Sequence, residues 1–162
     1  GLVDRVQAGK SYLMFGDGEL TACKPISDHD LAAYLADCLE QSDLQNKILP
    51  IGGPGPAITP KEQGEYLFSL LGEPPQLQRV PPAMLKWIGR ILGGIAKVFP
   101  PLAARAEYAR IGHYYATESM LVFDPETQSY RADLTPSTGS QTLFDHYRDL
   151  LKPAHGDGSA KV

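Results

Sequence analysis

The sequence predicts an α/β protein of one domain, because short strand-like runs alternate with capped amphipathic helices over its first half. The chain has 162 residues, an ordinary domain length, and 43% of them are hydrophobic, which is enough for a buried core. After Pro81 the pattern becomes mostly helical. The net charge of −4 argues against a general nucleic-acid binder, since such proteins usually carry a basic face.

Short apolar runs in the first half are candidate strands or extended segments, at residues 11–15, 20–23, 47–51 and 76–80. Asp17-Gly18 lies between the first two runs and predicts a β-hairpin, because glycine accepts the positive φ of such turns. We interpret residues 47–51 as a buried strand and residues 76–80 as a short extended segment. The Gly-Gly-Pro-Gly-Pro sequence of residues 52–56 predicts a loop.

Two helices begin with clear capping signals. Ser27 is a candidate N-cap with an acid three residues later, and Thr59 is followed by Pro60 and Glu62 in a capping-box pattern. An apolar stripe on the first helix predicts a buried face that includes a packed thiol: Leu31, Tyr34, Leu35, Cys38 and Leu39. The second helix is expected to end at Gly72 and to face inward with four residues: Tyr66, Leu67, Leu70 and Leu71.

The most apolar element is a helix predicted over residues 82–99. Its apolar side chains cover more than half of its circumference, so packing into the core is the default interpretation. An oligomer face, a lid over an apolar ligand and a monotopic membrane contact through Lys86, Arg90 and Lys97 are the alternatives. The same charges rule out a membrane span in this region. Gly93-Gly94 predicts a kink or a close packing contact.

Pro100-Pro101 starts a further helix, which we expect to end at Gly112. Residues 119–123 then predict a strand, residues 124–127 a turn, and Tyr130 the start of the partner strand. A short amphipathic helix follows at residues 142–151, and residues 153–162 are expected to be a disordered tail.

Several familiar chemical signals are missing from the sequence. Residues 52–55 do not fit a dinucleotide fingerprint, because prolines remove backbone donors and the spacing is wrong, so we expect a connecting or substrate-lining loop. The four histidines have no partners at metal-ligand spacing, and we therefore expect no metal. No Tyr-x-x-x-Lys pair appears, and the two cysteines suit a reducing compartment.

One cluster combines aromatic and polar side chains, in the segment 111–120. It contains His113, Tyr114, Tyr115, Glu118 and Ser119. Rings with hydroxyl tips suit a large flat ligand that carries a few polar groups. The alternative is that the tyrosines simply pack and their hydroxyls find backbone partners, and from the residues alone this alternative is favoured.

A series of short motifs occurs in a fixed order along most of the chain. In the first half they are residues 10–18, 22–27, 30–33, 49–55, 59–64 and 67–72. In the second half they are Tyr-Tyr-Ala at 114–116, Glu-Ser-Met-Leu at 118–121, Asp-Pro-Glu-Thr at 124–127 and Thr-Pro-Ser at 135–137. In this order, the motifs resemble the plant-type divinyl chlorophyllide 8-vinyl reductases, an atypical branch of the short-chain dehydrogenases.

The resemblance implies that the chain is the C-terminal part of a Rossmann-type fold with a mostly helical substrate-binding region. Residues 1–58 would supply the last core strands and helix, and residues 59–152 the substrate-binding region. The Gly-rich NADPH loop and the catalytic residues would lie upstream, so that this part alone holds no catalytic or cofactor-binding residue and is expected to be inactive.

The resemblance also implies an activity, which is the reduction of the 8-vinyl group of divinyl chlorophyllide to ethyl with hydride from NADPH. The setting would be chlorophyll or bacteriochlorophyll synthesis, either in the plastid of a plant or alga or in the bacterial cytoplasm, where the surface of the photosynthetic membrane is included. The partner would be divinyl chlorophyllide or a related chlorin, with no nucleic acid, no transmembrane segment and an optional peripheral membrane contact.

The substrate-binding candidates are His113, Tyr114, Tyr115, Glu118 and Trp87. His113 stands where the family pattern has arginine, and histidine would pair with a pigment carboxylate only when protonated. Two other functions remain open, a non-catalytic Rossmann-like regulator or accessory subunit, and a related reductase of another apolar substrate. An intact Gly-rich loop upstream would favour an enzyme.

Overall fold

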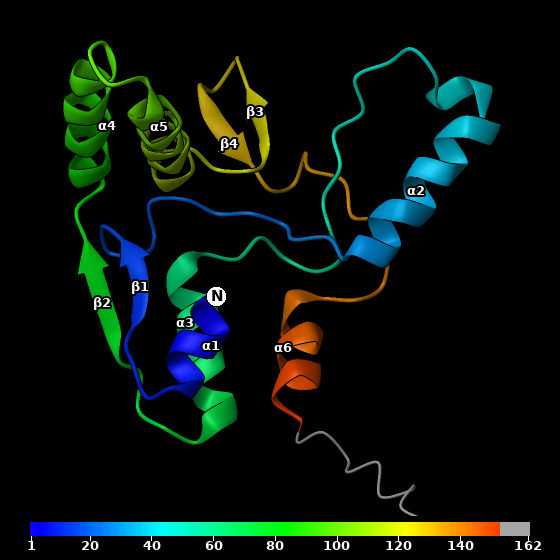
Figure 1. The fold of residues 1–162 in the computed structure, drawn as a ribbon. Helices are drawn as coiled ribbons and strands as arrows, with labels where there is room; N and C mark the ends of the chain where they lie inside the picture. The colour runs from blue at the N-terminus through cyan, green and yellow to red at the C-terminus, as the bar shows by residue number, and fades with distance from the viewer. Residues whose placement is uncertain (153–162) are drawn as a thin grey trace, which may run out of the picture.

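The computed structural model describes residues 1–152, and the predicted tail at 153–162 lies outside these residues. Helices and short strands alternate, which agrees with the predicted α/β class in its coarse form (Figure 1). The helices are α1 (Leu2–Gln7), α2 (Asp28–Glu40), α3 (Pro60–Leu71), α4 (Pro82–Ala96), α5 (Ala103–Thr117) and α6 (Leu143–Leu151), with 3-10 turns η1 (Ser42–Leu44) and η2 (Pro100–Leu102). The strands are β1 (Tyr12–Phe15), β2 (Leu77–Val80), β3 (Val122–Asp124) and β4 (Ser129–Arg131).

Strand β1 pairs with β2, in parallel, with Tyr12 opposite Leu77 and Phe15 opposite Val80. The hairpin predicted between residues 11–15 and 20–23 is therefore wrong. The backbone of β1 forms its hydrogen bonds with the distant strand β2 instead. For example, the Gly16 amide donates to the Val80 carbonyl at 2.9 Å. The predicted extended segment at 76–80 is confirmed as β2.

The core lies where β1 meets the helices, and its buried members are Val6, Tyr12, Met14, Leu67, Phe68 and Tyr147. Helix α3 reaches this core because Gly64 has no side chain. A Cβ at that position would lie 2.8 Å from the Tyr12 ring and 2.9 Å from Leu77. The sequence-predicted limits of α3 are confirmed, with the reciprocal capping box of Thr59 and Glu62 at its start and Gly72 in the left-handed region at its end.

Helix α2 begins at the predicted Ser27 cap, whose hydroxyl accepts a hydrogen bond from the Asp30 amide at 3.1 Å. Its apolar stripe, however, is not buried, and the prediction of a packed face around Cys38 is wrong. Leu35 and Leu39 are exposed, because α2 extends away from the other elements (Figure 1). The Asp30 carboxylate holds its first turn by accepting hydrogen bonds from the Ser140 and Gln141 amides, each at 3.1 Å.

The predicted strand at residues 47–51 is also wrong. Ile48 is fully exposed, and no strand pairs with this segment in the described part of the chain. The loop predicted over residues 52–56 is confirmed, and it packs closely against the segment before α2. Its Gly53 amide donates to the Lys24 carbonyl at 2.8 Å, and a Cβ on Gly53 would lie 1.7 Å from the Pro25 carbonyl oxygen.

Helices α4 and α5 form a hairpin that packs through small residues. Ala106 and Ala109 are buried, and a Cβ built on Gly89 would lie 3.6 Å from the Ala109 Cβ. The default prediction that the large residues of α4 pack into the core is therefore wrong, since the small ones take the contact. Helix α4 ends at Ala96 instead of residue 99, and α5 runs through Gly112 to Thr117 instead of ending there.

The predicted β-hairpin and final helix near the C-terminus are confirmed, but the first strand of the hairpin runs over Val122–Asp124 instead of residues 119–123. Strands β3 and β4 pair antiparallel, with Phe123 opposite Tyr130. Helix α6 begins at Thr142, which forms a capping box with Asp145, and it buries Tyr147 against the core.

Candidate functional site

Helix α5 carries three of the predicted site residues in succession, His113, Tyr114 and Tyr115. Successive residues of an α-helix point about 100° apart, so the three side chains leave the helix in different directions. Tyr114 and Tyr115 are 59% and 52% exposed, and their rings meet edge to face with centroids 5.8 Å apart. The structure thus presents two partly free aromatic rings with polar tips at the end of α5.

Glu118 follows directly at the end of the helix and receives a hydrogen bond from the Tyr130 hydroxyl at 2.6 Å. This bond to the carboxylate, helped by partial burial, raises the pKa of Tyr130 to about 12. The Tyr130 ring also meets Phe123 edge to face at 5.3 Å. Tyr130 was predicted only as a strand residue and not as part of the site. Its position opposite the aromatic Phe123 across a hairpin is the sequence signal that could have identified Tyr130 as a site residue.

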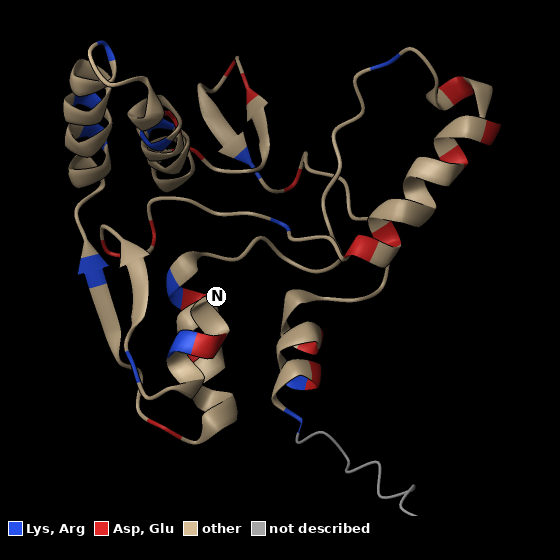
Figure 2. Cartoon of the chain, in the orientation of Figure 1, with Lys and Arg blue, Asp and Glu red and all other residues tan. Residues whose placement is uncertain are grey.

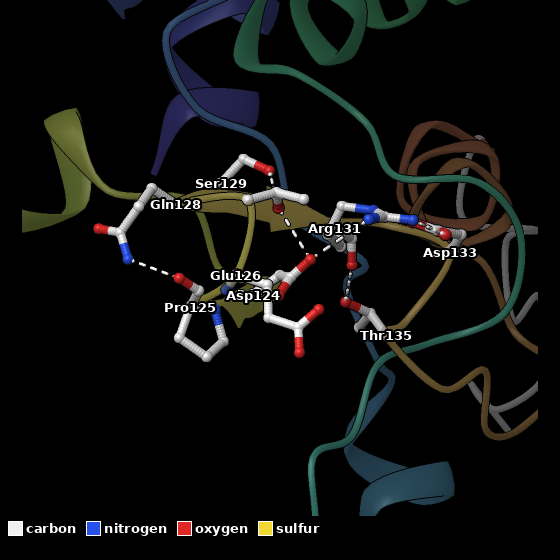
Figure 3. Close-up of polar contacts among 9 residues, drawn as sticks. Asp124, Pro125, Glu126, Gln128, Ser129, Arg131, Asp133 and Thr135 are labelled. Atoms are coloured by element: carbon white, nitrogen blue, oxygen red, sulfur yellow. Dashed lines mark hydrogen bonds and ion pairs between the residues drawn. The ribbon is translucent and has the colours of Figure 1, made fainter.

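A polar network fixes the hairpin that carries Tyr130 (Figure 3). The Arg131 guanidinium donates to both oxygens of Asp133, at 2.8 and 2.5 Å, and to Asp124 at 3.3 Å. The Thr127 hydroxyl donates to Asp124 at 2.8 Å and is the main reason why the pKa of that carboxyl is lowered. The buried Thr135 donates to the Arg131 carbonyl at 2.8 Å. Tyr130 is therefore held on a rigid support.

His113 lies elsewhere, in a groove of about 660 Å³ between α4 and α5. Four basic residues line this groove with it, and they are Lys86, Arg90, Lys97 and Arg110. Three glycines of α4 keep the groove open, and neither Tyr114 nor Tyr115 contributes to its lining. Sequence reasoning missed Arg110, although its place three residues before His113 puts it on the same helix face.

Trp87 is placed on a third surface, the outer face of α4, where it is 58% exposed. The Arg90 guanidinium carbon lies 5.2 Å from the centre of the indole ring, which is a cation–π distance. The five predicted residues therefore form three groups. Glu118 and the two tyrosines share the end of α5, His113 lies in the basic groove, and Trp87 pairs with Arg90.

A second cavity, of about 430 Å³, lies between the first turns of α2 and α6 and includes His29 and His146. It contains no residue of the predicted site. Within residues 1–152, no group of three His, Cys, Asp or Glu side chains is arranged to hold a metal ion. None of the described helices is both long and apolar enough to cross a bilayer. The Gly53 amide of the loop at 52–56 donates to the Lys24 carbonyl, and the Gly52 carbonyl accepts from the Thr138 amide, each at 2.8 Å.

Comparison with known proteins gives one consistent family. No protein-family model matches the chain. The divinyl chlorophyllide a 8-vinyl-reductase of Zea mays, named as chloroplastic, is 52% identical over 152 residues, which are 94% of this chain and 38% of the maize protein. The enzymes of the same name from Arabidopsis thaliana and Cucumis sativus are 50% and 52% identical, over 94% and 93% of the chain and 36% of each relative.

The chain thus spans little more than a third of the length of these relatives. Identity at this level along almost the entire chain confirms the resemblance that the ordered motifs indicated. The chain is a relative of the C-terminal part of plant divinyl chlorophyllide a 8-vinyl-reductases.

Proposed function

We propose that this chain forms the substrate-side part of an NADPH-dependent reductase that converts the 8-vinyl group of divinyl chlorophyllide to ethyl. The observation that carries the proposal is the identity of 50–52% with such reductases over almost the whole chain. The setting would be chlorophyll synthesis in a plastid, since the relatives are named as chloroplastic.

A Rossmann-type core is part of this proposal. The parallel pairing of β1 with β2, with α3 in the connection between them, supports it, because parallel strands need a crossover that is usually helical. Residues 1–58 would then contribute β1 to the core sheet. Of residues 59–152, α3 and β2 would belong to the same core, and the rest would form the substrate-binding region. NADPH, which supplies the hydride, would be bound by another part of the reductase, since residues 52–55 lack the spacing and the backbone donors of a dinucleotide fingerprint.

The chain's own contribution would be to bind and orient the pigment. A chlorin is a large flat ring with polar groups at its edge, and exposed aromatic rings with hydroxyl tips suit such a ligand. Tyr114 and Tyr115 would contact the ring, while Glu118, held by Tyr130, would keep the end of α5 in place. His113 in the basic groove would face a carboxylate, and Trp87 would add apolar surface.

Pigment titration of tyrosine variants tests this site. We expect Tyr114→Ala and Tyr115→Ala each to raise the Kd for divinyl chlorophyllide by roughly two- to tenfold, which is the value of one aromatic contact. Tyr108→Ala is the matched control, since Tyr108 is an exposed tyrosine of the same helix outside the cluster and should leave Kd unchanged. Equal binding by all three variants and the wild type would contradict the proposed site.

Turnover assays separate the enzyme from a binding protein. The chain alone should bind the pigment without reducing it, and a longer protein that includes this chain should form the ethyl product when NADPH is added. Vinyl reduction by residues 1–162 alone would show that the nucleotide site lies within this chain. Pigment binding without turnover by the longer protein would favour a non-catalytic accessory or regulatory role.

A further inference from the structure

Helix α4 has three faces of different chemistry. One face packs on α5 through Leu85, Gly89 and other small or half-buried residues. A second face carries five large apolar side chains that are 38–58% exposed, Met84, Trp87, Ile88, Ile91 and Ile95. Their spacing of three and four residues places them on one stripe along the helix. The third face is basic.

The apolar surface continues past the end of the helix. Val98 and Phe99, at the turn of the hairpin, are 89% and 56% exposed. Figure 1 shows this turn at the outer end of the α4–α5 hairpin, away from the core formed by α1, α3 and β1. The hairpin contact cannot bury the stripe, because the small residues of both helices already fill that contact.

The charges nearest to the stripe all have the same sign. Lys86, Arg90 and Lys97 lie together on one side of it, along the groove between α4 and α5. Helix α4 contains no acidic residue, and none of the three has an ion-pair partner within residues 1–152. Figure 2 shows α4 and the following turn with blue bands only. This local positive charge stands out in a chain whose net charge is −4.

Helix α2 provides an internal comparison. It also exposes large apolar residues, Leu35 and Leu39, but its charged residues are all acidic. An anionic surface would attract α4 and repel α2. Exposed apolar area alone therefore does not distinguish the two helices, and charge does.

We propose that the face of the α4–α5 hairpin formed by the apolar stripe and the turn docks on an anionic lipid membrane surface. Amphipathic helices of this kind lie in the plane of the bilayer with their apolar side about 5–10 Å deep at the headgroup boundary. Helix α4 has 15 residues and is about 22 Å long at the usual rise per residue, so it is long enough to lie along such a surface. Lys86, Arg90 and Lys97 meet the lipid phosphates, while Ile91, Ile95 and Val98 enter the apolar zone. The inference does not depend on the proposed activity.

Trp87 makes the docking measurable, since it is the only tryptophan of the chain and lies in the stripe. The purified chain is mixed with vesicles of phosphatidylcholine alone, or of equal parts phosphatidylcholine and phosphatidylglycerol. We expect flotation with the anionic vesicles only, together with a blue shift of the Trp87 emission. High salt should weaken the binding, because it screens the basic residues.

Two variants divide the contributions of charge and apolar contact. Replacing Lys86, Arg90 and Lys97 by Gln together should weaken binding to the anionic vesicles roughly a hundredfold, since each basic residue near such a surface contributes about fivefold. Replacing Ile91 and Ile95 by Ser should abolish the blue shift. The matched control, Leu35→Ser with Leu39→Ser, removes two exposed apolar residues from α2 and should change neither result.

Three outcomes would overturn the proposal. The first is absence of flotation with anionic vesicles by a chain whose circular dichroism shows it to be folded. The second is an equal loss of binding in the α2 control, which would indicate non-specific adsorption. The third is self-association of the chain without vesicles that the serine variant of Ile91 and Ile95 abolishes, which would assign the stripe to a second copy.

Discussion

At the scale of single residues, the informative pair is Glu118 and Tyr130. One lies at the end of α5 and the other on β4, and their 2.6 Å hydrogen bond joins the two elements beside the exposed Tyr114 ring. The carboxylate stabilises the protonated phenol, both by accepting its hydrogen and by its negative charge. Tyr130 therefore stays neutral and acts as a hydrogen-bond donor far above neutral pH.

Removing the carboxylate should release the phenol. In Glu118→Ala we expect the pKa of Tyr130 to fall from about 12 toward the ordinary value of about 10, which NMR of ring-labelled tyrosine would measure. Glu107→Ala is the control, because Glu107 lies on the same helix but pairs with Arg110. An unchanged Tyr130 titration in Glu118→Ala would mean that the hydrogen bond does not form in solution.

At the scale of elements, two glycines of similar sequence context have opposite roles. Gly53 lies where the loop before α3 touches the segment before α2, with no space for a side chain beside the Pro25 carbonyl. Gly94 lies inside α4, and nothing stands within 4 Å of a Cβ placed there. One glycine is required by packing, and the other only weakens its helix.

Alanine at each position should therefore change stability in opposite directions. We expect Gly53→Ala to lower the free energy of unfolding by at least about 2 kcal/mol, as overpacking against rigid backbone does. Gly94→Ala should raise it by about 0.5–1 kcal/mol, because alanine is the better helix former. Denaturant unfolding of the two variants checks both values. A destabilised Gly94→Ala variant would show that the groove between α4 and α5 is filled beside Gly94 in solution.

Local signals predicted the helices well. The caps at Ser27 and Thr59, the stop at Gly72 and the turn before Tyr130 depend on neighbours in the sequence, and all were confirmed. The pairing of β1 could not be predicted in this way, because its partner is distant and the Asp17-Gly18 turn resembled a hairpin turn. A periodic stripe, as on α2, shows that a helix has an apolar face but does not show what covers it.

The sequence predicted the candidate site as a cluster of aromatic and polar residues within one segment. In the structure, the side chains of this cluster lie on different surfaces. Because α5 continues through Gly112, consecutive residues point in different directions, and His113 enters the basic groove while Tyr114 and Tyr115 do not. Arg110 lines the groove because of its position around α5, and Tyr130 reaches Glu118 because of its position in the β3–β4 hairpin. Composition alone gives neither position.

At the scale of the whole molecule, phenols occupy the centre of the core. Tyr12 and Tyr147 are buried, and burial is the main reason why the pKa of each is raised. An ionised tyrosine would lose its hydration there without gaining a partner. The folded state therefore favours the protonated phenols, while the unfolded chain ionises them near pH 10.

The stability of the chain should then depend on alkaline pH. The protonated Tyr12 contributes fully to the free energy of unfolding below pH of about 10. This stabilisation is lost as the pH rises above that value, because the unfolded chain releases the Tyr12 proton first. In Tyr12→Phe the fall of the melting temperature at alkaline pH should be shallower than in the wild type. The exposed Tyr108→Phe serves as control and should follow the wild-type curve. Identical curves for both variants would mean that Tyr12 is not shielded in solution.

The long-range pairing of β1 with β2 has a consequence for the order in which the chain folds. The α4–α5 and β3–β4 hairpins join neighbouring segments, so their loop-closure entropy is small and they can form early. The β1–β2 ladder must bring Tyr12 to Leu77 around the whole of α2 and α3. During synthesis β1 therefore emerges first and has to wait for its partner, and it remains exposed to other extended chains during that interval.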